Sequence, residues 1–156
     1  RKHLKEDIHW MARQFNSAGA HLGHRYFSSP IIIPDGTPEP PDDLSRVTQS
    51  TWPGSRAPHA WIGDGLSTLD WFGDGFVLYF IPGRKESAQL IEKEFKEQCI
   101  PISLATSTLP SVQQLYEAPL VLVRPDGHVT WRGEMPPENI TNLALKAAGQ
   151  DIITNK

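Results

Sequence analysis

Six consecutive apolar residues, FVLYFI at positions 76–81, constrain the fold of this chain more than any other feature. A run this short and this rich in aromatic and β-branched residues is typical of a strand buried on both faces of a sheet. The stretch ESAQLIEKEFKEQ (86–98) follows, and a second strand is predicted at IPISLAT (100–106). The apolar residues between the strands share one helical face: Ala88, Ile91, Phe95 and Cys99. Strand, helix and strand in this order predict two parallel strands joined by a right-handed crossover.

The second half of the chain continues the alternation of helices and strands. LPSVQQLYE (109–117) predicts a short helix that opens on a proline. PLVLVR (119–124) and HVTWR (128–132) flank Pro-Asp-Gly, which favours a tight turn, so we expect an antiparallel hairpin. PPENITNLALKAAG (136–149) predicts a closing helix. The sequence therefore predicts an α/β fold, with a mixed sheet of about four strands in the order βαβ(α)ββα, flanked by helices.

The first third of the chain has a different character. Residues 4–22 carry apolar side chains at alternating spacings of four and three, which predict a long N-terminal helix. The stretch PDGTPEPPDD (34–43) is too rich in proline for a helix or a central strand and favours an exposed connection. We therefore divide the chain into a leading helical segment (1–33), a proline-rich connection (34–52) and an α/β domain (53–156). The leading helix either packs on this domain or is the tail of a preceding domain.

Composition narrows the classes of function. The 156 residues carry a net charge of −3, with scattered basic residues, which argues against a nucleic-acid partner. No apolar run approaches the roughly 20 residues that span a bilayer, so we expect no membrane partner. Cys99 is the single cysteine and the start of the chain lacks a signal pattern, so we expect a cytoplasmic protein.

The segment EAPLVLVRPDGHVTWRG (117–133), with the element order above, resembles the second half of the thioredoxin-like fold. This resemblance implies a cis proline before the third strand, so we expect the Ala118–Pro119 peptide bond to be cis. The Cys-x-x-Cys motif of the fold is replaced by PGRKES (82–87). Cys99 lies at the far end of the next helix, where we expect a small buried filler. Without a thiol pair the chain cannot perform dithiol exchange.

Four ordered motifs resemble the C-terminal region of FAD-dependent aromatic hydroxylases of the phenol and polyketide type. They are HRYFSSPII (24–32), PGSRAPHAWI (53–62), STLDWFG (67–73) and LVRPDGHVTWRG (122–133). The resemblance implies a parent enzyme that uses FAD, NAD(P)H and O₂ to hydroxylate a phenolic ring. It also implies that the leading segment is the tail of a flavin domain.

The chain lacks the Gly-x-Gly-x-x-Gly dinucleotide fingerprint of such flavin domains. We therefore expect no catalytic residue and no bound cofactor in this segment. Its expected partner is the N-terminal flavin domain of the same chain or a second copy in a homodimer.

The rigid loop PGSRAPH holds the strongest candidate site residues. Arg56 lies between Pro53 and Pro58, and His59 follows Pro58. The restricted backbone enables Arg56 to present a planar fork to a carboxylate or phosphate. One interpretation is a contact with the flavin domain or near its cofactor. The other is a structural clamp, in which Arg56 pairs with Asp64 or Asp70 and His59 bonds to backbone.

Other polar residues have weaker claims. His21 and His24 are three apart, but two histidines without a third ligand do not predict a metal site. Asp126 and His128 flank the predicted hairpin turn and are interpreted as turn residues. The serines lack the Gly-x-Ser-x-Gly motif of hydrolases. The tryptophans favour packing in the core or between domains: Trp10, Trp52, Trp61, Trp71 and Trp131.

Three functions follow from these observations. The first is a non-catalytic accessory domain that braces the flavin domain or a dimer of an aromatic hydroxylase. The second is a free-standing thioredoxin-like module that binds a protein partner through its tryptophan-rich loop. The third is a peroxiredoxin-type enzyme with Cys99 as nucleophile, which is disfavoured because Cys99 has no basic neighbour or helix N-terminus to lower its pKa.

Overall fold

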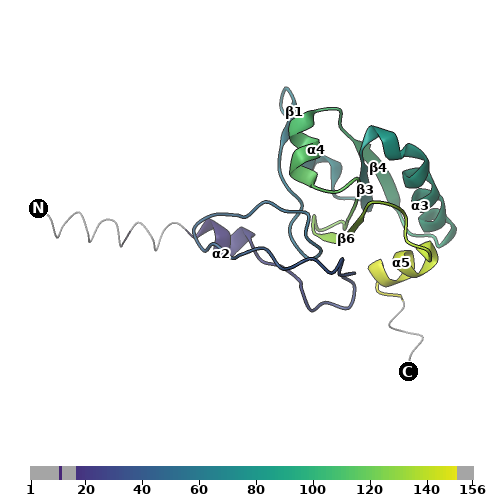
Figure 1. The fold of residues 1–156 in the computed structure, drawn as a ribbon, viewed down its shortest axis with the longest axis horizontal. Helices are drawn as coiled ribbons and strands as arrows, with labels where there is room; N and C mark the ends of the chain where they lie inside the picture. Colours follow the sequence, from purple (N-terminus) through teal and green to yellow (C-terminus); the bar gives the residue numbers. More distant parts are fainter. Residues whose placement is uncertain (1–10, 12–16, 151–156) are drawn as a thin grey trace, which may run out of the picture.

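The computed structural model describes Met11 and residues 17–150. Its centre is a four-stranded mixed sheet in the order β4-β3-β5-β6, seen nearly edge-on within the globular part in Figure 1. The strands are β3 (Phe76–Phe80), β4 (Ile102–Thr106), β5 (Leu120–Val123) and β6 (Val129–Gly133). β3 pairs in parallel with β4, whereas β5 is antiparallel to both of its neighbours.

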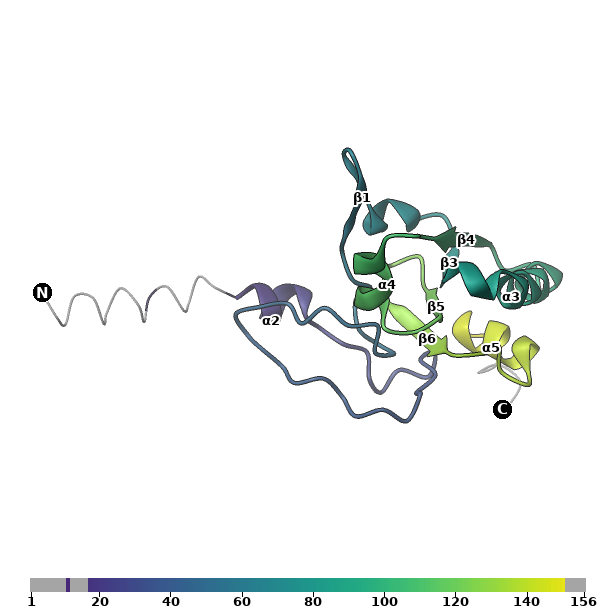
Figure 2. The same ribbon diagram turned by 45° about the horizontal axis from the view of Figure 1, so that its top comes forward.

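Four helices accompany this sheet in the described part of the chain. They are α2 (Ala18–Leu22), α3 (Lys85–Glu97), α4 (Pro110–Tyr116) and α5 (Ile140–Ala147). Two short 3₁₀ turns, η1 (Thr68–Trp71) and η2 (Pro82–Arg84), join other elements, and β1 (Trp61–Gly63) with β2 (Leu66–Ser67) forms a separate two-stranded sheet. Figure 2 shows this β1–β2 hairpin projecting beyond the body of the domain. No helix of residues 17–150 is long and apolar enough to cross a membrane.

The sheet buries both faces, as its continuous apolar strands predict. On one face, α3 and α5 pack against alternate residues of β3 and β5, including Leu78 and Leu122, which are fully buried. On the other face, Tyr79, Val121 and Val123 pack against α4 and the segment that precedes β3. Figure 1 shows α3 and α5 on the opposite side of the sheet from α4. The two central strands, β3 and β5, thus stabilise two layers of apolar packing.

The α/β class, the mixed four-stranded sheet and the strand–helix alternation from residue 76 onward are confirmed. The β1–β2 hairpin was not predicted, because strands of three and two residues are too short to show a periodicity. The long N-terminal helix falls mostly outside the described residues. Within them, α2 covers its last five positions, from Ala18 to Leu22.

The prediction of a cis peptide bond at Pro119 is wrong. All peptide bonds of the described residues are trans. The chain reverses one residue earlier, at Glu117, whose φ is +61°. The Ala118 amide donates to the Tyr116 carbonyl at 2.6 Å, which closes a three-residue γ-turn around Glu117. Because this turn already redirects the chain into β5, Pro119 continues it in the trans form, and its carbonyl accepts from the Ile81 amide at 3.0 Å.

The expectation that Cys99 is a buried filler is also wrong, since Cys99 is exposed. Cys99 follows the C-terminal end of α3 with a φ of +58°. The Cys99 amide donates to the Lys96 carbonyl and the Ile100 amide to the Phe95 carbonyl, the two bonds of a Schellman motif. Ile100 takes the buried position instead, with 4% of its surface exposed. The left-handed turn at Cys99 therefore rotates its side chain off the apolar face of α3.

Replacing Cys99 by glycine is expected to stabilise the protein by about 0.5–1 kcal/mol, because glycine adopts positive φ without the steric cost of a Cβ atom. Gly149 provides the matched control. It ends α5 with the same two hydrogen bonds at a φ of +74°, and a Cβ atom there would meet Ile31 at an ordinary 3.6 Å. Gly149→Ala should destabilise by about 1 kcal/mol. Urea unfolding measures both, and a destabilised Cys99→Gly variant would contradict the assignment.

Candidate functional site

The four sequence motifs, which span residues 24–133, meet at one end of the sheet. The Tyr26 amide donates to the Gly54 carbonyl at 3.0 Å, and the Gly54 amide donates to the Val129 carbonyl at 2.7 Å. The Ile33 amide donates to the Thr130 carbonyl at 2.9 Å. Segments of the first, second and fourth motifs are therefore joined directly through backbone hydrogen bonds.

Gly54 is required where these segments cross. Its φ is +99°, which residues with side chains rarely adopt. A Cβ atom on Gly54 would lie 3.1 Å from the carbonyl carbon of Tyr26. Glycine thus permits both the turn and the close approach of the first motif.

Residues 55–57 run beside the β5–β6 turn as a short extended segment. The Ala57 amide donates to the Gly127 carbonyl and the Val129 amide donates to the Ser55 carbonyl, both at 2.8 Å. Arg56 therefore stands opposite His128 in an antiparallel bridge. Ser55, Ala57 and Pro58 are buried, whereas Arg56 is exposed. The buried neighbours hold the backbone of Arg56 in place while its side chain faces outward.

The third motif is bound to the same loop through Thr68. The Thr68 hydroxyl donates to the Pro58 carbonyl at 2.8 Å and accepts from the Ala60 amide at 3.0 Å. Thr68 is completely buried, so these bonds fix the course of the loop. Pro58 contributes its carbonyl to this arrangement as well as a restricted backbone.

The predicted pairing of Arg56 with Asp64 or Asp70 is not found among residues 17–150. Asp70 instead accepts a hydrogen bond from the Ser67 amide at 2.6 Å, and Ser67 caps the Leu69 amide, which together form a capping box at the start of η1. Asp64 lies exposed in the turn between β1 and β2. A local hydrogen bond three residues away thus outcompetes a distant ion pair for Asp70.

His59 is held by a side chain rather than by the backbone contact that we expected. Its amide donates to the Gln49 side-chain oxygen at 2.6 Å. Its ring packs edge-on against Trp61, with ring centroids 5.1 Å apart. His59 therefore positions the first residue of β1.

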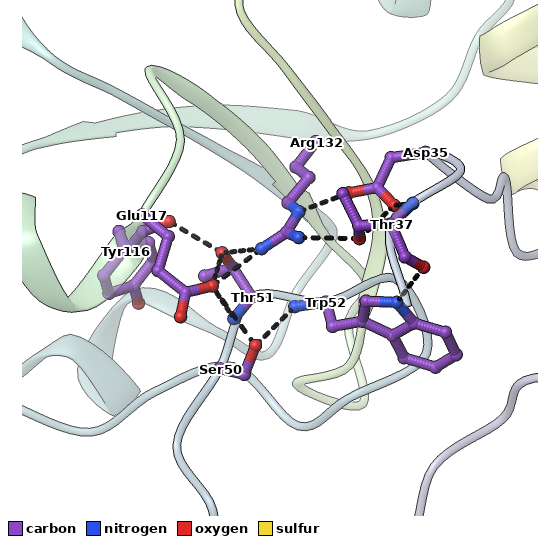
Figure 3. A network of polar contacts seen from close by, with 8 residues as sticks. All are labelled: Asp35, Thr37, Ser50, Thr51, Trp52, Tyr116, Glu117 and Arg132. Carbon is purple, nitrogen blue, oxygen red and sulfur yellow. Dashed lines mark hydrogen bonds and ion pairs between the residues drawn. The ribbon is translucent and has the colours of Figure 1, made fainter. Parts of the chain in front are cut away.

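Arg132 organises a second cluster, which sequence analysis missed (Figure 3). Its Nε donates to Asp35 at 2.6 Å and its Nη1 to Glu117 at 2.7 Å. The Arg132 Nη2 donates to the Thr37 hydroxyl at 3.1 Å, and Nη1 also reaches the Thr51 hydroxyl at 3.2 Å. One guanidinium thereby connects both ends of the proline-rich segment to β6 and to the end of α4. The sequence does contain a signal for an ordered turn in this region, because Asp35-Gly36-Thr37 lies between two prolines.

Asp35, one of the two acidic partners of Arg132, is held in its charged form. Partial burial of Asp35 acts to raise the pKa of its carboxyl group, but hydrogen bonds from Thr37 and Arg132 and the Arg132 charge outweigh it. The pKa of Asp35 therefore lies below its ordinary value. The Arg132 and Asp35 side chains are both only 14% exposed, so solvent weakens their interaction little.

The described residues contain no group of three or more His, Cys, Asp or Glu side chains arranged to hold a metal ion. The sequence after β3, where a thioredoxin would carry its thiol pair, forms η2 and contains no cysteine. Cys99 lies at the opposite end of α3. The chain therefore has no pair of sulfur atoms with which to exchange a disulfide.

Comparison with known proteins identifies the family. Residues 50–153 match the sequence family described as "Aromatic-ring hydroxylase, C-terminal". The chain therefore belongs to the C-terminal domain family of FAD-dependent aromatic-ring hydroxylases, which confirms the resemblance drawn from the four motifs.

Individual relatives agree with this assignment. The FAD-dependent monooxygenase apdD of Emericella nidulans is 34% identical over 147 residues, which cover 86% of this chain and 23% of that protein. Phenol 2-monooxygenase of Pseudomonas sp. is 31% identical over 140 residues, covering 78% of this chain and 23% of that protein. This chain thus spans about a quarter of the length of these relatives.

Solved structures share the fold. The rebeccamycin biosynthetic enzyme REBC in its substrate-free form superposes with a TM-score of 0.78 at 36% identity, covering 94% of this chain and 26% of that one. Aklavinone-11 hydroxylase in a complex with FAD and aklavinone superposes with a TM-score of 0.67 at 26% identity. The match covers 83% of this chain and 26% of the hydroxylase chain. In these comparisons too, the chain corresponds to a quarter of a larger protein.

Replacing Arg132 by methionine is expected to lower the free energy of unfolding by about 2 kcal/mol at pH 7, because it leaves two carboxylates without their shared donor. Since the pKa of Asp35 is lowered in the folded state, its stabilising effect is present above the unfolded pKa near 3.9 and is lost as pH falls through the folded pKa. The difference between wild type and variant should therefore shrink below about pH 4.

Urea unfolding between pH 3 and pH 7 measures this difference. Arg46→Met is the control, since Arg46 is exposed and its charge acts on the exposed Asp43 only from beyond ion-pair distance. Equal stability of Arg132→Met and wild type, or a difference independent of pH, would rule out the assigned role.

Proposed function

We propose that this chain is the C-terminal, thioredoxin-like, non-redox domain of an FAD-dependent, NAD(P)H-using monooxygenase that hydroxylates phenolic or other aromatic substrates. The observation that carries the proposal is the match of residues 50–153 to the C-terminal family of aromatic-ring hydroxylases. FAD and the nicotinamide would bind elsewhere in the parent enzyme. The role of this domain is to brace the flavin domain or a dimer.

The thioredoxin-like assignment rests on topology. The parallel β3–α3–β4 unit is followed by α4, the β5–β6 hairpin and α5 around a sheet ordered β4-β3-β5-β6. The chain has the element order of a thioredoxin without its thiol pair. Such a scaffold offers binding surfaces but no sulfur chemistry.

The bracing surface that we assign is the β1–β2 hairpin with η1. Trp61, Leu66 and Leu69 are 65%, 56% and 41% exposed. Three large exposed apolar side chains on this hairpin and the adjoining η1 are unfavourable in water unless a partner covers them. The capping box at η1 and the contact between His59 and Trp61 keep this surface in one conformation.

The division of the chain is also a proposal. We assign residues 1–33 to the segment that leads from the flavin domain, 34–52 to the connection and 53–156 to the accessory domain. Arg25 of the leading segment binds Glu39 and Asp42 of the connection, and Arg132 of the accessory domain binds Asp35 of the connection. These contacts support a connection that is fastened along the domain surface rather than free in solvent.

A free-standing protein-binding module is the alternative. The same exposed hairpin favours it, because the patch would fit a separate protein as well as a covalently joined domain. The mass of the natural polypeptide distinguishes the two. The accessory domain requires a parent about four times as long, since the chain covers 23% of apdD.

The hairpin can be tested in the complete parent polypeptide. Trp61→Ser combined with Leu66→Ser should lower the melting temperature of the flavin-bound enzyme and increase loss of FAD, because it removes apolar contact between the domains. Leu90→Ser is the matched control, as Leu90 is 53% exposed on α3, away from the hairpin. Retention of FAD and melting temperature equal to the control would exclude the hairpin as the bracing surface.

The isolated chain provides a second test. It is expected to be colourless after purification, to oxidise no NADPH and to reduce no insulin disulfides, with Cys99→Ser behaving like wild type. The reason is that the proposed cofactor sites lie outside it and its one thiol has no partner. Absorption spectra and a turbidity assay measure these properties. Bound flavin, or peroxidase activity lost in Cys99→Ser, would contradict the proposal.

A further inference from the structure

Arg56, His128 and Arg124 form a row across three adjacent backbone segments. Arg56 is bridged to His128, and the Arg124 amide donates to the His128 carbonyl at 2.8 Å on the other side. Residues opposite each other in antiparallel pairs project to the same face, with Cβ atoms about 5 Å apart. Two guanidinium groups therefore flank one imidazole on a single face at the end of the sheet.

The positive charge of this row is only partly offset. Asp126 pairs with Arg124 at 3.0 Å and lies 3.5 Å from the His128 Nδ1. Arg56 forms no ion pair and no guanidinium hydrogen bond with any residue between 17 and 150. Like charges placed opposite each other in a sheet are destabilising. The row consequently has a net positive charge that the described residues leave uncompensated.

His128 adds a buried polar atom to the row. It is 8% exposed, and its Nδ1 has no hydrogen-bond partner among the described residues, since the geometry toward Asp126 does not form one. Burial lowers the pKa of His128, Asp126 acts to raise it, and the charges of Arg56 and Arg124 lower it further. An anion at the row would counter the two guanidinium charges and raise that pKa.

The Tyr26 ring helps to position two members of the row, His128 and Arg124. The Tyr26 ring lies 4.7 Å from the His128 ring and 6.0 Å from the Arg124 guanidinium carbon, measured from the Tyr26 centroid. His24 packs edge-on against Tyr26 at 5.0 Å. Pre-arranged donors bind an anion without the entropic loss of ordering long side chains.

We propose that Arg56, Arg124 and His128 form a binding site for an oxyanion, that is, a carboxylate or phosphate group. The exposed Arg56 fork supplies the principal paired hydrogen bonds, Arg124 supplies the adjoining positive charge, and the His128 imidazole lies between them. The site is a property of this chain alone and does not depend on the function proposed above. From sequence alone, Arg56 has a structural clamp as one of its two interpretations, and His128 is interpreted as a turn residue. The proposed site gives both residues a role in binding a ligand.

The test uses the purified chain, with inorganic phosphate and glutarate as probes at constant ionic strength. NMR titration of the His128 imidazole should show that each bound probe raises the pKa of His128. Arg56→Gln should weaken binding about tenfold or more, because a charge-assisted fork is lost. Arg46→Gln, which removes an exposed guanidinium elsewhere, should bind as wild type does. Arg56→Lys keeps the charge without the fork and should give intermediate affinity.

The outcomes separate the two sources of the oxyanion. Binding of phosphate alone assigns a phosphate group, binding of glutarate alone assigns a carboxylate group, and binding of both assigns a general oxyanion site. Circular dichroism of each variant confirms that it is folded. The proposal is overturned if neither probe shifts the His128 titration, or if Arg46→Gln weakens binding as much as Arg56→Gln.

Discussion

The backbone pairing of residues 54–57 with the β5–β6 hairpin is the interaction on which the arrangement of the motifs depends. Gly54 bonds to both Tyr26 and Val129, so the leading segment, the loop and the sheet meet at one residue. This pairing places Arg56 opposite His128 and brings the Tyr26 ring against the His128 ring. A Cβ atom on Gly54 would displace the leading segment and, with it, the ring that covers His128.

The regular part of the fold could be predicted because its signals are local. The continuous apolar run of β3 and the single apolar stripe of α3 follow from burial on two faces and on one. The turns at Glu117 and Cys99 could not be predicted, because both place residues with side chains at positive φ, where glycine would be expected. Their conformations are imposed by the hydrogen bonds around them, which no local pattern reveals.

The candidate site was only half predictable for a related reason. The motifs located the loop around Arg56, but a motif does not state which charges meet. Asp70 was assigned to Arg56 and instead caps η1, while Arg132, which sequence analysis passed over, bonds Asp35 at a separation of 97 residues. Because local hydrogen bonds form at little entropic cost, Asp70 accepts from the nearby Ser67 amide rather than pairing with Arg56. Distant ion pairs depend on the complete fold, and sequence spacing carries no information about them.

The arginines of this chain differ in whether a carboxylate of the same chain neutralises their charge. Arg25 and Arg132 have mostly buried side chains and two carboxylate partners each. The charge of Arg25 joins the proline-rich segment to the leading segment, and that of Arg132 joins the proline-rich segment to the domain. Arg124 shares its one carboxylate partner, Asp126, with His128. Arg56 lies between two residues whose backbone groups bond to the β5–β6 hairpin, yet its charge meets no acidic group in the described part of the chain. A rigid backbone that presents an unmatched charge beside a buried imidazole has no evident benefit for folding alone, because it adds repulsion without an internal contact. The arrangement is accounted for when the missing negative charge arrives with a ligand or a partner.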